Sequence, residues 1–293
     1  MVRSFQLSLA VIIIFLAACT GTVHQDSRPT ISVSILPQKY LTERIAGDNF
    51  KINVLVPSGS SAETYEPTPR QMQDAANSVL YFRIGYLEFE RTLVRNIQAQ
   101  NTNLRFVNTS EGIDLIAAEI ADHGDHVHLY GVDPHTWITV TGVRMQAENM
   151  LEAIIDADPD NKEQYLENYN IFIEELDQLH AELNKKFSDV KRRTFIIFHP
   201  ALGYFARDYG LTQISIEQEG KNPTAANMRQ IIDIAREEGI RDVLIQMEFE
   251  LDNAMVVARE LGGEVIEINP LSENWMDSMT EIADKLFEVL NKD

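Results

Sequence analysis

Cysteine is nearly absent from this chain of 293 residues, which contains only Cys19. A single thiol cannot form an internal disulfide, so a hydrophobic core must hold the fold together. Basic residues are also scarce, with 25 Lys and Arg against 45 Asp and Glu, and the formal net charge is −20. Such a chain repels phosphate backbones, so nucleic acid is not an expected partner.

The familiar catalytic signatures are missing as well. The sequence contains no HExxH helix motif, no GxSxG elbow and no P-loop. These motifs would carry a metalloprotease, a serine hydrolase or a nucleotide-phosphate site, respectively. Their absence favours a binding protein over an enzyme.

Long hydrophobic runs are limited to the N-terminus, where an apolar run extends from Leu7 to Leu16. It is too short for a membrane span and is typical of a secretory signal peptide, which we place at residues 1–18. The segment Leu16-Ala17-Ala18-Cys19 resembles the bacterial lipobox, in which the cysteine is lipidated. We expect an exported protein anchored through Cys19, facing the periplasm or cell surface, with a tether over residues 19–29. The alternative is an ordinary signal peptide with an incidental cysteine.

The remaining sequence alternates short β-branched runs with helical patterns, which predicts an α/β fold with mostly parallel sheets. Two lobes are expected, at residues 30–157 and 191–293, each with a four-stranded sheet. The expected strands cover residues 31–36, 52–56, 78–82, 104–107, 194–198, 213–216, 243–246 and 264–268. The expected helices between them cover residues 40–46, 70–77, 87–97, 141–157, 204–209, 225–238, 253–261 and 275–290.

A long helix is predicted between the lobes, over residues 158–190. Asp158 is a suitable N-cap, and Pro159 suits the first helical position. Apolar residues then recur every three or four residues without an internal Gly or Pro. About 30 residues would span roughly 45 Å, longer than a small domain is wide. We interpret the helix as a strut between the lobes, with a coiled-coil dimer as the alternative.

Three residues point to a metal site. His199 follows a strand that reads as buried, and ligands bind at the carboxyl ends of strands in open α/β sheets. His135 lies in the sequence DPHTW, where Asp133 could orient the imidazole by accepting its second N–H. Glu63 lies in the loop after the second strand. Taken singly, His199 could cap a helix, His135 could belong to a turn and Glu63 could be solvated.

A second group of histidines lies close together in the sequence ADHGDHVHLYG. His123, His126 and His128 are interleaved with Asp122 and Asp125. Short His-rich segments are typical of metal binding, and the close spacing favours an auxiliary chelating loop. A polar surface loop is the alternative. His180 is expected to be a solvated residue of the long helix.

These motifs together resemble the ZnuA/TroA-like family of zinc and manganese solute-binding proteins of ABC importers, some of which were once described as adhesins. The resemblance covers nearly all the chain from Thr30 onward. The motifs that carry it are SSAETYEPTP (60–69), DPHTW (133–137), DPDNKEQYLENY (158–169), FHPALGYFARDYG (198–210), EGKNPT (219–224) and INPL (268–271).

The resemblance implies a metal held in the cleft between the lobes and delivered to an ABC permease. Its usual ligand positions correspond here to Glu63, His135, His199 and Asn269. Two departures stand out, since Glu63 replaces a His and Asn269 replaces an Asp. Two imidazoles and a carboxylate suit zinc, with manganese or iron as alternatives, whereas an Asn carbonyl is a poor fourth ligand.

Two other functions are alternatives to metal transport. A His₂Glu site with a water at the fourth position is also the arrangement of catalytic zinc, so a zinc-dependent hydrolase is the rival hypothesis. Glu217 or Glu248 could then serve as a general base, although packing or capping is expected for Glu248. A surface adhesin is compatible with a lipid anchor, but no residue specifies it.

Overall fold

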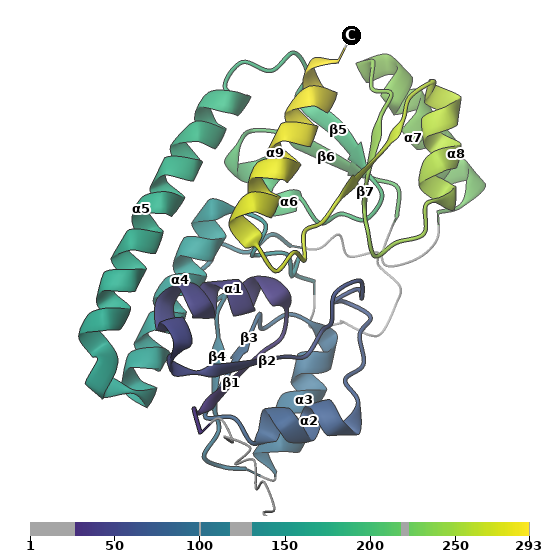
Figure 1. The fold of residues 1–293 in the computed structure, drawn as a ribbon. Helices are drawn as coiled ribbons and strands as arrows, with labels where there is room; N and C mark the ends of the chain where they lie inside the picture. Colours follow the sequence, from purple (N-terminus) through teal and green to yellow (C-terminus); the bar gives the residue numbers. More distant parts are fainter. Residues whose placement is uncertain (1–26, 100, 118–130, 218–222, 293) are drawn as a thin grey trace, which may run out of the picture.

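The computed structural model describes residues 27–99, 101–117, 131–217 and 223–292. Two lobes lie one above the other, and a long helix runs along one side of both (Figure 1). The predicted signal peptide, Cys19 and the histidines at 123, 126 and 128 lie outside the described residues. Within the described ranges, no helix is long and apolar enough to cross a membrane.

The N-terminal lobe is built on a parallel sheet with the strand order β2-β1-β3-β4. The central strands β1 and β3 are almost entirely buried, as expected for parallel strands covered by helices. Its elements are β1 (Thr30–Val33), α1 (Leu36–Ala46), a 3₁₀ turn (Gly47–Asn49), β2 (Lys51–Val54), α2 (Pro69–Ala76), β3 (Leu80–Arg83), α3 (Glu88–Gln98), β4 (Arg105–Asn108) and α4 (Val140–Ala157).

The C-terminal lobe repeats this design, with a parallel sheet in the order β6-β5-β7-β8. The chain runs from β5 to β6 on one side and from β7 to β8 on the other. The loops after β5 and β7 therefore separate, which leaves a crevice at the carboxyl ends of these two strands. The elements are β5 (Thr194–Ile197), α6 (Gly203–Asp208), β6 (Thr212–Ser215), α7 (Ala225–Glu238), β7 (Val243–Gln246), α8 (Asp252–Leu261), β8 (Val265–Ile268) and α9 (Trp275–Asn291).

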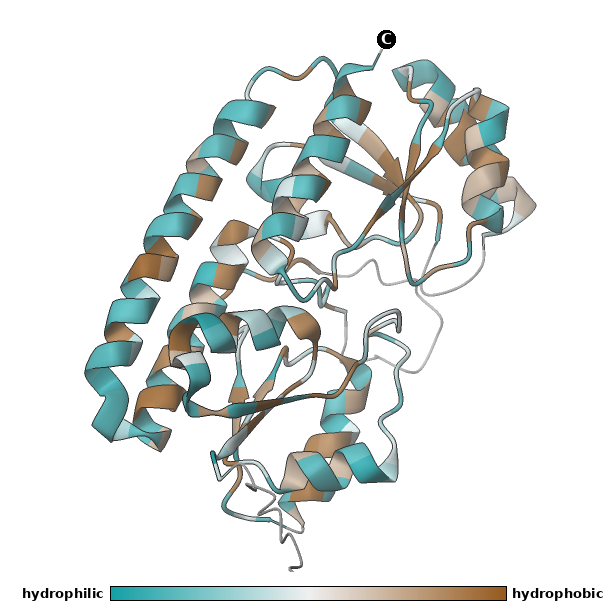
Figure 2. Cartoon of the chain, in the orientation of Figure 1, coloured by the Kyte–Doolittle hydropathy of each residue, from teal (hydrophilic) through white to brown (hydrophobic). Residues whose placement is uncertain are grey.

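The long helix is α5 (Lys162–Phe187), which follows a 3₁₀ turn at Pro159–Asn161. It packs against α1 and α4 of the N-terminal lobe and against α9 of the C-terminal lobe. Its apolar seam is buried within the chain, including Phe172 and Leu176, and Figure 2 shows a largely hydrophilic outer side. Burying each such side chain contributes about 1.5–3 kcal/mol. The interpretation of this helix as a strut is therefore confirmed.

All eight predicted strands are present, but two local expectations were wrong. The first strand ends at Val33 rather than at residue 36, and α1 begins at Leu36 because Pro37 suits the first helical turn. Asp158 does not cap a backbone N–H. Its carboxylate instead accepts hydrogen bonds from the side chains of Asn161 and Tyr165.

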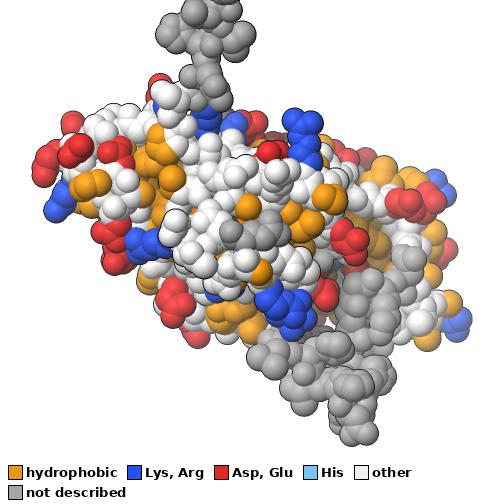
Figure 3. Space-filling model, turned by 90° about the horizontal axis from the view of Figure 1, so that it is seen from below, with side chains coloured by type: hydrophobic (Ala, Val, Ile, Leu, Met, Phe, Trp, Pro, Cys, Tyr) orange, Lys and Arg blue, Asp and Glu red, His pale blue; other side chains and the backbone are white. Residues whose placement is uncertain are grey.

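Surface charge follows the composition. On the face seen in Figure 3, the described Lys and Arg side chains are scattered among acidic ones. His180 differs from the expectation of a solvated residue. It is half-buried, and its Nδ1 lies 3.1 Å from the hydroxyl of Tyr209.

Candidate metal site

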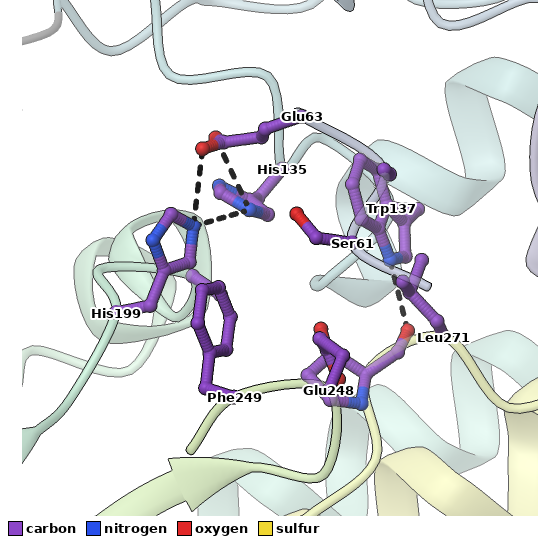
Figure 4. Close-up of a pocket in the computed structure, with 11 residues that line it drawn as sticks. Ser61, Glu63, His135, Trp137, His199, Glu248, Phe249 and Leu271 are labelled. Carbon is purple, nitrogen blue, oxygen red and sulfur yellow. Dashed lines mark hydrogen bonds and ion pairs between the residues drawn. The ribbon is translucent and has the colours of Figure 1, made fainter. Parts of the chain in front are cut away.

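Glu63 lies in the loop that joins β2 to α2. The base of this loop is fastened by Gln71, whose amide donates to the carbonyl of Leu55 at 2.7 Å. Thr68 and Gln71 form a capping box at the start of α2, which fixes where the loop ends. Ala62, next to Glu63, is buried. These contacts hold the Glu63 side chain over the space between the lobes (Figure 4).

His135 lies in the segment before α4, which makes contact with both lobes. Asp133 accepts from its Nδ1 at 2.7 Å, so Nε2 is left to face the cavity. The indole of Trp137 donates to the carbonyl of Pro270, and the indole of Trp275 donates to the carbonyl of Trp137. This pair of hydrogen bonds joins the His135 segment to the C-terminal lobe. The predicted orienting role of Asp133 is consistent with this geometry.

A glycine makes this packing possible. A Cβ on Gly142, in the first turn of α4, would lie 2.0 Å from the carbonyl oxygen of Thr136. No side chain fits at that distance, so the close approach of α4 to the His135 segment requires glycine.

His199 follows β5 at the crevice of the second sheet. Gln246 donates to its carbonyl at 2.7 Å, and the Phe249 ring stacks on the imidazole with centroids 4.8 Å apart. Its Nδ1 lies 2.9 Å from a carboxylate oxygen of Glu217, which leaves Nε2 facing the cavity. No sequence motif indicated this role of Glu217, because the residue follows a different strand from His199.

The three side chains converge from both lobes (Figure 4). The Nε2 atoms of His135 and His199 are 3.3 Å apart. One oxygen of Glu63 lies 3.5 Å from Nε2 of His199, and the other lies 3.7 Å from Nε2 of His135. Among the described residues, these three offer ligand atoms that all lie within 4.8 Å of one another.

The pKa values of Glu63 and His199 are both shifted toward the charged forms of these side chains. Burial raises the pKa of Glu63, but the hydrogen bond from His199 and the charges of both histidines outweigh it and lower the pKa to about 2. Burial lowers the pKa of His199, but Glu217 and Glu63 outweigh it and raise the pKa to about 10. Both histidines are almost completely buried. Carboxylates thus stabilise positive charge at this point.

Asn269 does not line this cavity. Its side-chain oxygen accepts the backbone N–H of Leu271 at 3.2 Å, and the lining of the cavity includes Pro270 and Leu271 but not Asn269. Glu248, for which packing or capping was expected, lines the cavity. Glu248 follows β7 and so lies at a strand end, where ligands bind in such sheets. Many carboxylates in the chain share this position, so it does not single out Glu248.

Comparison with known proteins supports a specific family. A family model described as "Zinc-uptake complex component A periplasmic" matches residues 31–289. The chain belongs to this family. Members of the family are solute-binding proteins of ABC importers, so the expectation that this chain is not an enzyme is confirmed.

Individual relatives of this zinc-uptake family agree in fold and length. The "High-affinity zinc uptake system protein ZnuA" of Bacillus subtilis is 28% identical over 90% of this chain and 86% of its own length. The "Manganese-binding lipoprotein MntA" of Halalkalibacterium halodurans is 24% identical over 89% and 86%, respectively. A solved structure, "Crystal structure of ZnuA", is 35% identical, with a TM-score of 0.84 over 90% of this chain and 99% of that one. The predicted two-lobed fold is confirmed.

Proposed function

We propose that this protein captures a divalent transition metal, zinc by preference, between its lobes and delivers it to an ABC permease. The observation that carries this proposal is the spacing of the three ligand atoms. Ligands at about 2.0–2.2 Å from a tetrahedral zinc lie about 3.3–3.6 Å from one another. The two nitrogens are 3.3 Å apart, and each lies 3.5 or 3.7 Å from the nearer oxygen of the Glu63 carboxylate, which is close to that range.

The chemistry of the ligands supports the same reading. Glu63 supplies an anionic oxygen, while His135 and His199 supply imidazole nitrogens, a combination that zinc accepts readily. Each imidazole is held through its other nitrogen by a carboxylate, the outer-shell arrangement usual for metal-bound histidine. Manganese and iron are the alternative cargoes, since carboxylates also suit manganese and imidazole also suits iron.

Capture should fasten the lobes together. Glu63 and His135 precede the strut and His199 follows it, so one ion would cross-link both lobes. Because α5 packs on helices of both lobes, it restricts wide opening, and metal entry should require only small shifts of loops. A wide hinge motion of the two lobes is not expected.

Delivery requires that the protein stay near its permease. We infer that residues 1–18 direct export, that Cys19 carries lipid, and that the protein is anchored to a bacterial membrane on its outer side. His123, His126 and His128 would collect metal ahead of the main site. The domain limits of 30–157, 158–190 and 191–293 belong to the same proposal.

The proposal is tested by measuring metal content after purification without added metal, followed by competition between zinc and manganese. We expect one tightly bound equivalent in a variant lacking residues 123–128. Glu63→Gln should weaken zinc binding by at least about tenfold. Glu66→Gln is the control, because it removes an exposed carboxylate three residues away in the same loop that does not line the cavity.

His135→Ala and His199→Ala complete the test. A ligand that binds only the folded state stabilises it, by about 2.7 kcal/mol at a concentration of 100 times Kd. Each variant should therefore lose most of the zinc-dependent rise in melting temperature. Normal zinc binding by the Glu63 and His199 variants would refute the site.

A further inference from the structure

A second carboxylate faces the same cavity. Glu248 follows β7, in the loop that leads to α8, and it lines the cavity together with Glu63 and both histidines. Figure 4 shows it on the other side of the cavity from Glu63, on the C-terminal lobe. It lies next to Phe249, whose ring stacks on His199. The loop therefore already contributes to the surroundings of the metal site.

This carboxylate forms no ion pair with a Lys or Arg among the described residues. Burial raises its pKa, while a hydrogen bond from its own backbone N–H and the charges of His199 and His135 act in the opposite direction. Partly buried charges are normally paired or bound to a metal, because loss of hydration costs free energy. A cation in the cavity would supply the missing charge.

The C-terminal lobe also lacks the carboxylate ligand that the family resemblance assigns to it, because Asn269 stands at that position. Asn269 carries no charge, and its oxygen is engaged by the N–H of Leu271. With Glu63 as the only anionic ligand, the ligand atoms themselves would leave one positive charge of a divalent cation unbalanced. A second carboxylate would neutralise that charge, and Glu248 is the one that lines the cavity.

We propose that Glu248 is the fourth metal ligand, supplied by the C-terminal lobe in place of Asn269. The inference rests on the proposed function and specifies how that site is completed. Glu248 lies outside the group of atoms that are already within 4.8 Å of one another, so its loop must shift inward on binding. An inward shift would break little packing on the outer side of that loop, since Met247 and Leu251 are more than 40% exposed.

The donor set then consists of two imidazoles and two carboxylates, shared equally between the lobes. Carboxylate oxygens suit manganese better than they suit softer ions, whereas imidazoles suit zinc. Glu248 would therefore influence which metal is carried. Its removal should cost more affinity for manganese than for zinc.

The test compares Glu248→Gln with Glu250→Gln. Both variants remove one negative charge from the same loop, but Glu250 is exposed and does not line the cavity. Zinc and manganese affinities are measured by chelator competition, and the visible spectrum of bound Co²⁺ reports the coordination. We expect Glu248→Gln to weaken zinc binding at least about tenfold relative to Glu250→Gln, to weaken manganese binding more, and to change the Co²⁺ spectrum.

Two further measurements separate ligation from a structural role. Without metal, Glu248→Gln should melt no lower than wild type, because it removes a buried charge. A capping or packing role would instead lower the melting temperature. Asn269→Ala should lose stability with its hydrogen bond to Leu271, yet leave the Co²⁺ spectrum unchanged.

The outcomes distinguish this inference from the proposed function. If wild type binds one equivalent and Glu63→Gln loses it, but Glu248→Gln matches Glu250→Gln in affinity or retains the wild-type Co²⁺ spectrum, Glu248 is not a ligand. If wild type binds no metal, or if Glu63→Gln binds normally, the site itself is wrong.

Discussion

Metal binding should be strongly dependent on pH, because zinc and a proton compete for the same nitrogen of His199. The carboxylates of Glu217 and Glu63 overcome the effect of burial and raise the pKa of His199 to about 10, against an ordinary 6.5. In the metal-free protein this imidazole is therefore protonated at neutral pH. A zinc ligand must be a neutral imidazole, so binding must release the proton.

The size of the effect follows from the pKa. Below the pKa of the metal-free site, apparent affinity rises tenfold for each pH unit. Between about pH 7 and pH 9, zinc affinity should therefore rise about 100-fold, which corresponds to about 2.7 kcal/mol. A histidine with an ordinary pKa would already be neutral over this range, and affinity would hardly change.

The stability of the metal-free protein depends on pH in the opposite direction from its zinc affinity. The folded state raises the pKa of His199, so folding favours the protonated imidazole. The resulting stabilisation is fully present below pH 6.5, the ordinary pKa, and is lost as pH rises through about 10. Raising the pH should thus destabilise the metal-free protein while tightening its hold on zinc.

Calorimetric titration in buffers with different ionisation enthalpies measures the proton directly. At about pH 8, His199 should release about one proton for each zinc bound. Glu217→Gln should release less, because the pKa of His199 falls when one of its two carboxylate partners is removed. It should also weaken binding about 10–100-fold, most visibly at high pH, where proton competition is weakest.

Glu238→Gln is the control, since it removes an exposed carboxylate from the same lobe. It should match wild type in both proton release and affinity. The reasoning is refuted if zinc affinity stays constant over this range without proton release, or if Glu217→Gln behaves like Glu238→Gln. Either result would mean that the imidazole of His199 is not held as a protonated partner of the two carboxylates.

Three further predictions concern other parts of the chain. Gly142→Ala should lower the free energy of unfolding by about 1–3 kcal/mol in urea denaturation, because its Cβ would meet the Thr136 carbonyl, whereas Glu148→Ala on the exposed side of α4 should change it by less than about 0.5 kcal/mol. Cys19→Ala should leave zinc affinity unchanged and move the protein from the detergent phase to the aqueous phase; continued partitioning with detergent would contradict lipidation. Deletion of residues 123–128 should lower the total number of metal ions bound without weakening the first equivalent, and a large loss of first-site affinity would identify a primary ligand there.

The sequence determined the architecture because the fold depends on local patterns. Runs of β-branched residues placed all eight strands, and the three- and four-residue spacing of apolar side chains such as Phe172 and Leu176 identified the strut. The boundaries at Leu36 and Asp158 were missed, since they depend on local competition between side chains and backbone. For example, the side-chain oxygen of Gln38 accepts a hydrogen bond from the backbone N–H of Ser34, just before α1.

The sequence also identified Glu63, His135 and His199 as candidates, and Asp133 as the partner of His135, because each lies at the end of a predicted strand or in a recognisable motif. It could not identify the partner of His199 or the hydrogen bond that engages the side chain of Asn269. Glu217 and His199 follow different strands, so only the order β6-β5-β7-β8 places them side by side. The side chain of Asn269 is engaged by its own loop, and Glu248 reaches the cavity because β7 lies next to β5, a neighbour relationship that local sequence does not encode.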